Sequence, residues 1–217
     1  IDVLASAFDS AGERCSALRV LCLQDEIADH TLKMLRGAMA ECRMGNPGRL
    51  TTDIGPVIDS EAKVNIERHI QTMRSKGRPV FQAVRENSED AREWQSGTFV
   101  APTLIELDDF AELQKEVFGP VLHVVRYNRN QLPELIEQIN ASGYGLTLGV
   151  HTRIDETIAQ VTGSAHVGNL YVNRNMVGAV VGVQPFGGEG LSGTGPKAGV
   201  PLYLYGLRAT RPESARA

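Results

Sequence analysis

Helical periodicity alternates with short β-rich runs along most of this chain, and this alternation constrains its fold more than any other feature. From Asp25 to about Arg43, apolar residues recur at spacings of three to four or multiples of them, which predicts an amphipathic helix. The run Val121–Tyr127 is the clearest candidate for a buried strand. Helices that alternate with strands are typical of a sheet covered by helices, so we expect an α/β fold.

Chain breakers and end signals place the other elements. Gly77 and Pro79 end a second helix that begins after Ser60. The tail alternates leucine and tyrosine over Leu202–Leu207, which predicts a last strand. Further helices are expected at Asp2–Phe8, from Pro133 to about Gly143 and from Thr152, and further strands at Ala17–Leu23, Val80–Val84, Phe99–Leu107, Leu146–His151 and Gly168–Asn173.

The composition is that of an ordinary globular chain. Hydrophobic residues make up 42% and charged residues 22% of the 217 residues, so intrinsic disorder is not expected. The 22 basic and 26 acidic side chains give a net charge of −4, which disfavours nucleic acid as a partner. The longest aliphatic stretch, Val177–Val183, contains two glycines and is too short for a membrane span. Ile1–Ala5 already resembles a helix interior, so we expect a longer parent protein.

The three cysteines differ in their surroundings. Their odd number and spacings fit neither a disulfide framework nor a zinc site, which favours a reducing cytoplasm. Cys22 and Cys42 lie in apolar patterns and are expected in the core. Cys15 lies in the polar turn Gly12–Ser16, where its thiol can be reached and Arg14 could favour the thiolate. Cys15 is therefore a candidate nucleophile, and the alternative is an ordinary free cysteine.

Two observations limit what Cys15 could do alone. A helix is predicted to end shortly before it, and the dipole at a helix C-terminus disfavours an anion. The five histidines share no spacing, so we predict no metal site. For the same reason, no histidine stands out as the base of a Cys/His hydrolase, which is an alternative enzyme class.

The stretch between Asn173 and Val200 is dominated by glycine, and we expect a ligand-binding loop there. Gly188–Gly193 matches G-x-G-x-x-G, but it lies among prolines and not between a strand and a helix, so we reject a dinucleotide-binding fingerprint. Gly190–Lys197 misses a phosphate-binding loop because Pro196 stands where that motif needs glycine. These glycines therefore need another explanation.

A carboxylate and an aromatic ring stand together before the strand at Val121. Glu116 is followed by Phe118 and then by Gly119 and Pro120. Such a pair at a strand entrance is a candidate binding site, and the alternative is a solvated loop acid.

Four motifs in one order and spacing resemble the aldehyde dehydrogenase superfamily. A narrower resemblance over Asn173–Lys197 is to L-glutamate γ-semialdehyde (1-pyrroline-5-carboxylate) dehydrogenases, above all to that module of the bifunctional proline-utilisation flavoproteins of enteric bacteria. The chain departs from the family at Glu13, where glutamine is usual, and at Val200, where relatives tend to have glycine. The four motifs are Gly12–Cys15, Glu116–Pro120, Asn140–Leu146 and Pro185–Gly188 with Ser192–Gly193.

The resemblance implies an NAD-dependent oxidation of L-glutamate γ-semialdehyde to L-glutamate in proline catabolism, through a thiohemiacetal and thioester on Cys15. It implies that Glu116 binds the nicotinamide ribose and that Phe118 lies against the nicotinamide end of NAD. For the substrate, it places donors to the α-carboxylate at Ser16 and at the backbone of Gly178 and Ala179. Phe186 would pack against the substrate methylenes.

The resemblance also implies an architecture. Residues 1–199 would form a three-layer αβα catalytic domain that ends in a glycine-rich substrate loop, 174–199. Residues 200–217 would form an oligomerisation arm and tail, with a homodimer made through Leu202–Leu207. FAD and DNA binding would belong to upstream parts of a parent protein that is cytoplasmic or peripheral at the inner membrane.

A non-catalytic function is the alternative to the enzyme activity. In the family, the cofactor-binding domain, the oxyanion-hole asparagine and the general-base glutamate precede the cysteine. The chain by itself could therefore be a catalytically incomplete fragment that acts only in assembly or interaction.

Overall fold

Two groups of elements, each with its own internal contacts, make up the structure, a computed structural model. It describes residues 1–217 except 84–93, 95, 181, 194–196, 201–202 and 207–217. The first unit is Ile1–Leu132 and the second is Pro133–Ala217. Each unit is described by itself.

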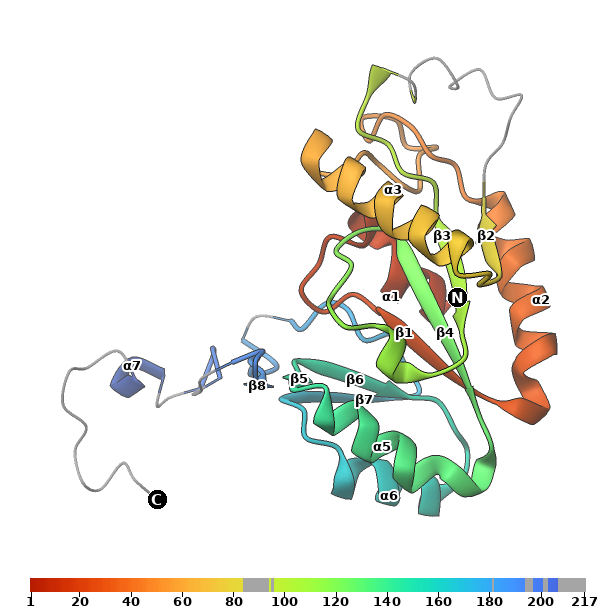
Figure 1. Ribbon diagram of the computed structural model, residues 1–217. Coiled ribbons are helices and arrows are strands. Elements are labelled where there is room, and N and C mark those ends of the chain that lie inside the picture. Colours follow the sequence, from red (N-terminus) through yellow and green to blue (C-terminus); the bar gives the residue numbers. More distant parts are fainter. Residues whose placement is uncertain (84–93, 95, 181, 194–196, 201–202, 207–217) are drawn as a thin grey trace. The chain divides into compact units, whose positions relative to one another are not determined.

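Four strands of the first unit form one sheet (Figure 1). They are β1 (Val20–Gln24), β2 (Val80–Gln82), β3 (Thr103–Leu107) and β4 (Val121–Tyr127), in the order β1-β4-β3-β2. β4 is parallel to both β1 and β3, whereas β2 is an antiparallel edge strand. This parallel-dominated sheet with helices between its strands confirms the predicted α/β class.

Three helices pack with this sheet: α1 (Asp2–Phe8), α2 (Asp25–Glu41) and α3 (Ser60–Ser75). Asp59 begins α3, because its carboxylate accepts a hydrogen bond from the Ala62 N–H. Gly77, with φ of 77°, follows the end of α3 as predicted. The shared core contains fully buried side chains from α2, α3, β3 and β4, namely Leu32, Met39, Ile70, Leu104, Val121, Leu122 and Val124.

The second unit contains a small parallel pair of strands joined through a helix. α5 (Leu132–Ala141) starts at the last residue of the first unit and otherwise belongs to the second. β6 (Thr147–Val150) runs parallel to β7 (Asn169–Val172), with α6 (Asp155–Ser164) between them in the chain. β5 (Tyr144–Gly145) pairs with β8 (Glu189–Gly190) in an antiparallel bridge. The predicted alternation therefore continues through the second half of the chain.

The predicted strand over Leu202–Leu207 is wrong where the structure describes it. Tyr203–Gly206 forms a single helical turn, α7, and residues 202 and 207 lie outside the described residues. An alternating pattern favours a strand only where a neighbouring strand satisfies the backbone, and here the Tyr203 N–H instead donates to the Val200 carbonyl at 3.0 Å.

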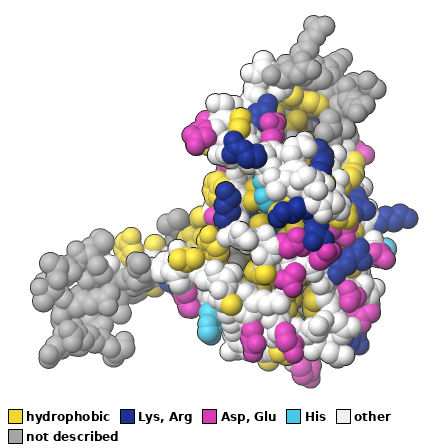
Figure 2. Space-filling model, in the orientation of Figure 1, with side chains coloured by type: hydrophobic (Ala, Val, Ile, Leu, Met, Phe, Trp, Pro, Cys, Tyr) yellow, Lys and Arg dark blue, Asp and Glu magenta, His cyan; other side chains and the backbone are white. Residues whose placement is uncertain are grey.

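The surface of the first unit mixes both signs of charge. Figure 2 shows basic and acidic side chains interspersed on the face it displays. Arg126, for example, pairs with Asp29 at 2.7 Å and with Glu106 at 3.0 Å. Of the helices that the structure describes, none is long and apolar enough to cross a membrane.

Candidate active site

Cys15 follows a left-handed turn that begins where α1 ends. Ser10, Ala11 and Gly12 have φ of 55°, 55° and 68°. This conformation costs a residue with a side chain about 1–2 kcal/mol, so surrounding contacts must hold it in place. At Gly12 a Cβ atom would lie 2.2 Å from the Gly119 carbonyl oxygen, so only glycine fits without movement.

The cysteine occupies an exposed turn beyond that point. The Ala17 N–H donates to the Arg14 carbonyl at 3.0 Å, which closes the turn around Cys15 and Ser16. Cys15 is exposed, whereas Ser16 is buried. Several residues separate Cys15 from the end of α1, so the predicted opposition of the helix dipole does not apply, because that effect fades within the last turn.

The other two cysteines have settings that suit packing. Burial raises the pKa of the Cys22 thiol to about 12. The Cys42 thiol donates to the Ala38 carbonyl at 3.6 Å. Cys15 is the one exposed cysteine of the three.

Glu13, the departure from the family pattern, is directed into a contact of its own. Its carboxylate accepts a hydrogen bond from the Ile58 N–H at 3.1 Å. The second departure from the family pattern is Val200. Its φ is not positive, whereas the preceding Gly199 has φ of 83°. The strain that a β-branched residue would suffer there is therefore avoided.

Glu116 and Phe118 project from the loop that leads into β4. The intervening Val117 is buried and anchors the loop, while the Glu116 side chain is 38% exposed and Phe118 is 44% exposed. Gly119 lets the loop approach α3, because a Cβ atom there would lie 2.4 Å from Ile66 Cδ1. An acid and an aromatic ring, two residues apart in the chain, are thus both partly exposed to solvent.

The pairing of β1 with β4 brings this loop near the cysteine turn. The two strands are parallel and begin at the same sheet edge, with Val20 opposite His123. Cys15 precedes β1 and Glu116 precedes β4, so both lie toward the amino ends of these strands. Ligands of parallel sheets more often bind at the carboxyl ends, so the site does not follow that rule.

Arg19, which sequence reasoning missed, joins the two segments. Its Nε donates to Glu116 Oε1 at 2.9 Å, and its guanidinium carbon lies 4.6 Å from the centre of the Phe118 ring. Burial lowers the pKa of Arg19, and the nearby Glu116 and Glu13 carboxylates act against that shift. A lone arginine before a strand carries no local signal of this role, since Glu116 lies 97 residues away.

A histidine pair lies next to Arg19, with His123 fully buried and His69 half-buried. His123 Nδ1 is 3.1 Å from the Arg19 carbonyl, and its Nε2 is 2.8 Å from His69 Nε2. A carbonyl only accepts, so Nδ1 of neutral His123 must carry the proton, and His69 Nε2–H then donates to His123 Nε2. Burial lowers the pKa of His123 to about 4, and the proximity of His69 adds to that shift. The pair is therefore neutral at neutral pH.

The predicted substrate loop belongs to the second unit. Gly178 is exposed with φ of 83°, and Ala179 and Phe186 are half-buried. The backbone of Phe186 exchanges two hydrogen bonds with Ala198, at 3.0 and 2.8 Å. Ser16 belongs to the first unit, so the four predicted substrate ligands are divided between the two units.

Asn169 holds both neighbours of Phe186. Its Nδ2 donates to the Pro185 carbonyl at 2.8 Å, and its Oδ1 accepts from the Gly187 N–H at 3.2 Å. The side-chain amide of β7 therefore fixes the backbone on each side of the ring. Sequence reasoning did not identify this residue.

The glycines of Gly188–Gly193 are explained by close packing. A Cβ atom on Gly188 would lie 2.6 Å from the Ser192 carbonyl oxygen, and one on Gly193 would lie 2.3 Å from the Gly188 oxygen. Gly190 has φ of 58° and lies against Gly143.

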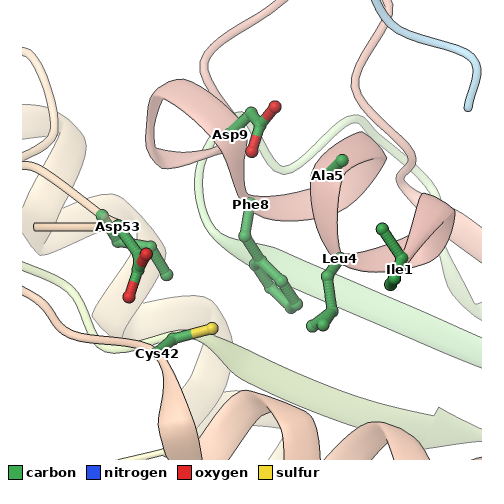
Figure 3. A pocket seen from close by; sticks show the side chains of 8 residues that line it. Ile1, Leu4, Ala5, Phe8, Asp9, Cys42 and Asp53 are labelled. Carbon is green, nitrogen blue, oxygen red and sulfur yellow. The ribbon is translucent and has the colours of Figure 1, made fainter.

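An apolar cavity of about 230 Å³ lies elsewhere in the first unit. Figure 3 shows side chains of α1, including Leu4 and Phe8, together with Cys42 and Asp53 around it. Neither Cys15 nor Glu116 lines this cavity, so we assign it no part in the site.

Comparison with known proteins gives consistent matches. The aldehyde dehydrogenase family model matches residues 2–207. Bifunctional protein PutA of Escherichia coli (strain K12) is 96% identical over 217 residues, which make up all of this chain and 16% of that protein. The chain therefore spans about a sixth of that relative.

Solved structures match both in sequence and in fold. A variant of Bradyrhizobium japonicum proline utilization A (PutA) has a TM-score of 0.85 at 50% identity, over 93% of this chain and 20% of that one. A 1-pyrroline-5-carboxylate dehydrogenase from Thermus, with bound NAD, has a TM-score of 0.82 at 36% identity, over 94% of this chain and 38% of that one. With its sequence motifs, its parallel-dominated α/β sheet and these matches, the chain belongs to the aldehyde dehydrogenase family.

Proposed function

We propose that this chain supplies the nucleophile-bearing part of an NAD-dependent dehydrogenase that oxidises L-glutamate γ-semialdehyde to L-glutamate. The observation that carries the proposal is the exposed Cys15 turn, which Arg19 joins to the Glu116 loop. The names of the relatives support this substrate class, since one is a 1-pyrroline-5-carboxylate dehydrogenase with bound NAD.

The residues of the first unit fit the nicotinamide end of NAD. The Glu116 carboxylate is partly exposed and can accept hydrogen bonds from ribose hydroxyls, and the exposed Phe118 ring offers an apolar surface. When bound, NAD⁺ supplies the hydride acceptor. Glu116 and Phe118 would hold and orient it beside the cysteine turn.

Cys15 would perform the covalent chemistry. Its thiolate attacks the aldehyde carbon, and oxidation of the resulting thiohemiacetal leaves a thioester on sulfur. Water then releases the carboxylic acid and the free thiol. The backbone N–H of Cys15 would contribute to binding the oxyanion.

The substrate α-carboxylate would be bound by Ser16 and by the backbone of Gly178 and Ala179, and Phe186 would pack on the methylenes. The exposed backbone of Gly178 supports this role, because no side chain blocks an approaching anion. This arrangement needs residues of both units.

The finer architecture also stays a proposal. Residues 1–199 would act as one three-layer αβα catalytic domain, with 200–217 as an arm. Pairing of two copies through residues 202–207 would require α7 to become extended. We expect the parent protein to act in the cytoplasm.

The test uses a hybrid enzyme in which this chain replaces the 217 matching residues of E. coli PutA. We expect the hybrid enzyme to form NADH from the semialdehyde and Cys15→Ala to abolish this. Cys42→Ala is the matched control and should keep the activity. Iodoacetamide should label Cys15 before Cys22 or Cys42. A hybrid enzyme that folds and binds NAD but forms no NADH would instead favour a role in assembly only.

A further inference from the structure

The Arg19 side chain is the connection between the cysteine turn and the Glu116 loop. Besides Glu116, its guanidinium contacts three backbone carbonyls. Nη1 donates to Gly12 at 2.6 Å and to Gly119 at 3.3 Å, and Nη2 donates to Arg14 at 3.1 Å. All three guanidinium nitrogens therefore donate, and the acceptors come from both sides of the site.

Burial of the Arg19 guanidinium would destabilise the fold if its hydrogen-bond partners were lost. The Arg19 side chain is only 14% exposed, and a buried charge is tolerated when it is paired and hydrogen-bonded. The planar fork of arginine can reach several acceptors at once, whereas a lysine ammonium cannot match that geometry. The position is therefore built for arginine.

The contact with Glu116 leaves part of that carboxylate available. Arg19 binds Oε1, and no partner for Oε2 is recorded among the residues that the structure describes. A carboxylate held through one oxygen has a restricted orientation, so its second oxygen can bind a hydroxyl without a further loss of side-chain freedom.

We infer that Arg19 is a positioning residue: it orients Glu116 for the ribose hydroxyls of the cofactor and locks the Cys15 turn to the same loop. The inference rests on the proposed function and deepens it. Arg19 itself need not touch NAD or the aldehyde, because it acts through Glu116 and through the carbonyls of Gly12 and Arg14.

The test measures NAD binding by calorimetry alongside the steady-state kinetics of the hybrid enzyme. Charge-assisted hydrogen bonds make net contributions that correspond to about tenfold to a hundredfold in affinity. We therefore expect Arg19→Met to weaken NAD binding about tenfold to a hundredfold and to raise the KM for NAD by a similar factor. Arg19→Lys keeps the charge, so it should recover part of the affinity. The kcat of Arg19→Lys should be lower than that of the unmodified hybrid enzyme, because lysine cannot donate to both the Gly12 and the Arg14 carbonyl.

A double-variant cycle separates positioning from general damage. Because Arg19 acts on NAD through Glu116, adding Glu116→Gln to Arg19→Met should weaken binding by less than about twofold more. Arg68→Met, an exposed arginine of α3, is the control and should bind NAD as the unmodified hybrid does. Equal NAD affinity in Arg19→Met, or effects of the two changes that simply multiply, would overturn the inference.

Folding and the proposed function are checked separately. If Arg19→Met does not fold, judged by circular dichroism, the same cycle is run with Arg19→Lys. If the unmodified hybrid enzyme binds NAD but oxidises no semialdehyde, the proposed function fails, and the calorimetric cycle still decides the role of Arg19.

Discussion

Gly12 is the residue on which the cysteine turn depends most directly. A side chain there would have to adopt φ of 68° with its Cβ atom 2.2 Å from the Gly119 carbonyl oxygen. We expect Gly12→Ala to destabilise the chain by about 2 kcal/mol or more, since strain and steric overlap add. Urea unfolding followed by circular dichroism measures this change.

The matched control for Gly12→Ala is Gly37→Ala. Gly37 lies within α2, and a Cβ atom added there would meet nothing within 4 Å. Alanine is the better helix former, so this change should stabilise the chain by up to about 1 kcal/mol. Equal effects of the two substitutions would show that the Gly12 turn does not require glycine.

For some helices and strands, the sequence pattern predicted the first and last residues correctly. α1 and β4 have the predicted bounds, because an apolar pattern and its chain breakers are both local. β1 begins at Val20 and not at Ala17, because the Leu18 N–H is bonded to the Ser6 carbonyl outside the sheet. The tail differs because, among the described residues, no strand pairs with Tyr203–Gly206, which form a helical turn instead.

The candidate site could be predicted from the sequence only at residues that belong to a recognised motif. Cys15 and Glu116 belong to short motifs, so the sequence could locate both. Arg19 and Asn169 were missed because their partners depend on tertiary structure: Arg19 meets Glu116 through the pairing of β1 with β4, and Asn169 meets Pro185 across a loop. No sequence spacing encodes such contacts.

β7 supports the predicted substrate loop through Asn169. Asn169→Ala removes the contacts to the Pro185 carbonyl and the Gly187 N–H, so Phe186 between them should lose its fixed position. In the hybrid enzyme, we expect the KM for the semialdehyde to rise about tenfold, with the KM for NAD changed less than twofold. Steady-state kinetics with each substrate varied in turn measure both.

The control for Asn169→Ala is Asn130→Ala, at an exposed position outside the loop, which should change neither KM. A rise in both KM values with Asn169→Ala would indicate general damage to the fold instead of a loss of substrate positioning.

For the whole molecule, the division into two units separates the predicted chemistry from the predicted substrate contacts. The first unit contains Cys15, Arg19 and Glu116, and the second contains the loop with Gly178 and Phe186. The family match extends over residues 2–207 and so includes both units. The proposed catalytic and cofactor-binding residues therefore belong to the first unit, and most of the proposed substrate contacts belong to the second.

The pair of buried His123 and half-buried His69 should make the stability of the first unit depend on pH. Burial lowers the pKa of folded His123 to about 4, from 6.5 when unfolded, so the unfolded chain takes up a proton first as the pH falls. The contribution of His123 to the free energy of unfolding is fully present above about pH 6.5. It should be lost progressively as the pH falls to about 4, which lowers the free energy of unfolding by roughly 3 kcal/mol. Burial also lowers the pKa of His69, which adds in the same direction.

His123→Asn tests this dependence, because asparagine removes the titrating ring and can still donate to the Arg19 carbonyl. Urea unfolding midpoints between pH 7.5 and 4.5 should fall less steeply for this variant than for the unmodified chain. The exposed His30 is the control, since His30→Asn should leave the slope unchanged. The same steep fall in His123→Asn as in the unmodified chain would assign the acid sensitivity to groups other than this pair.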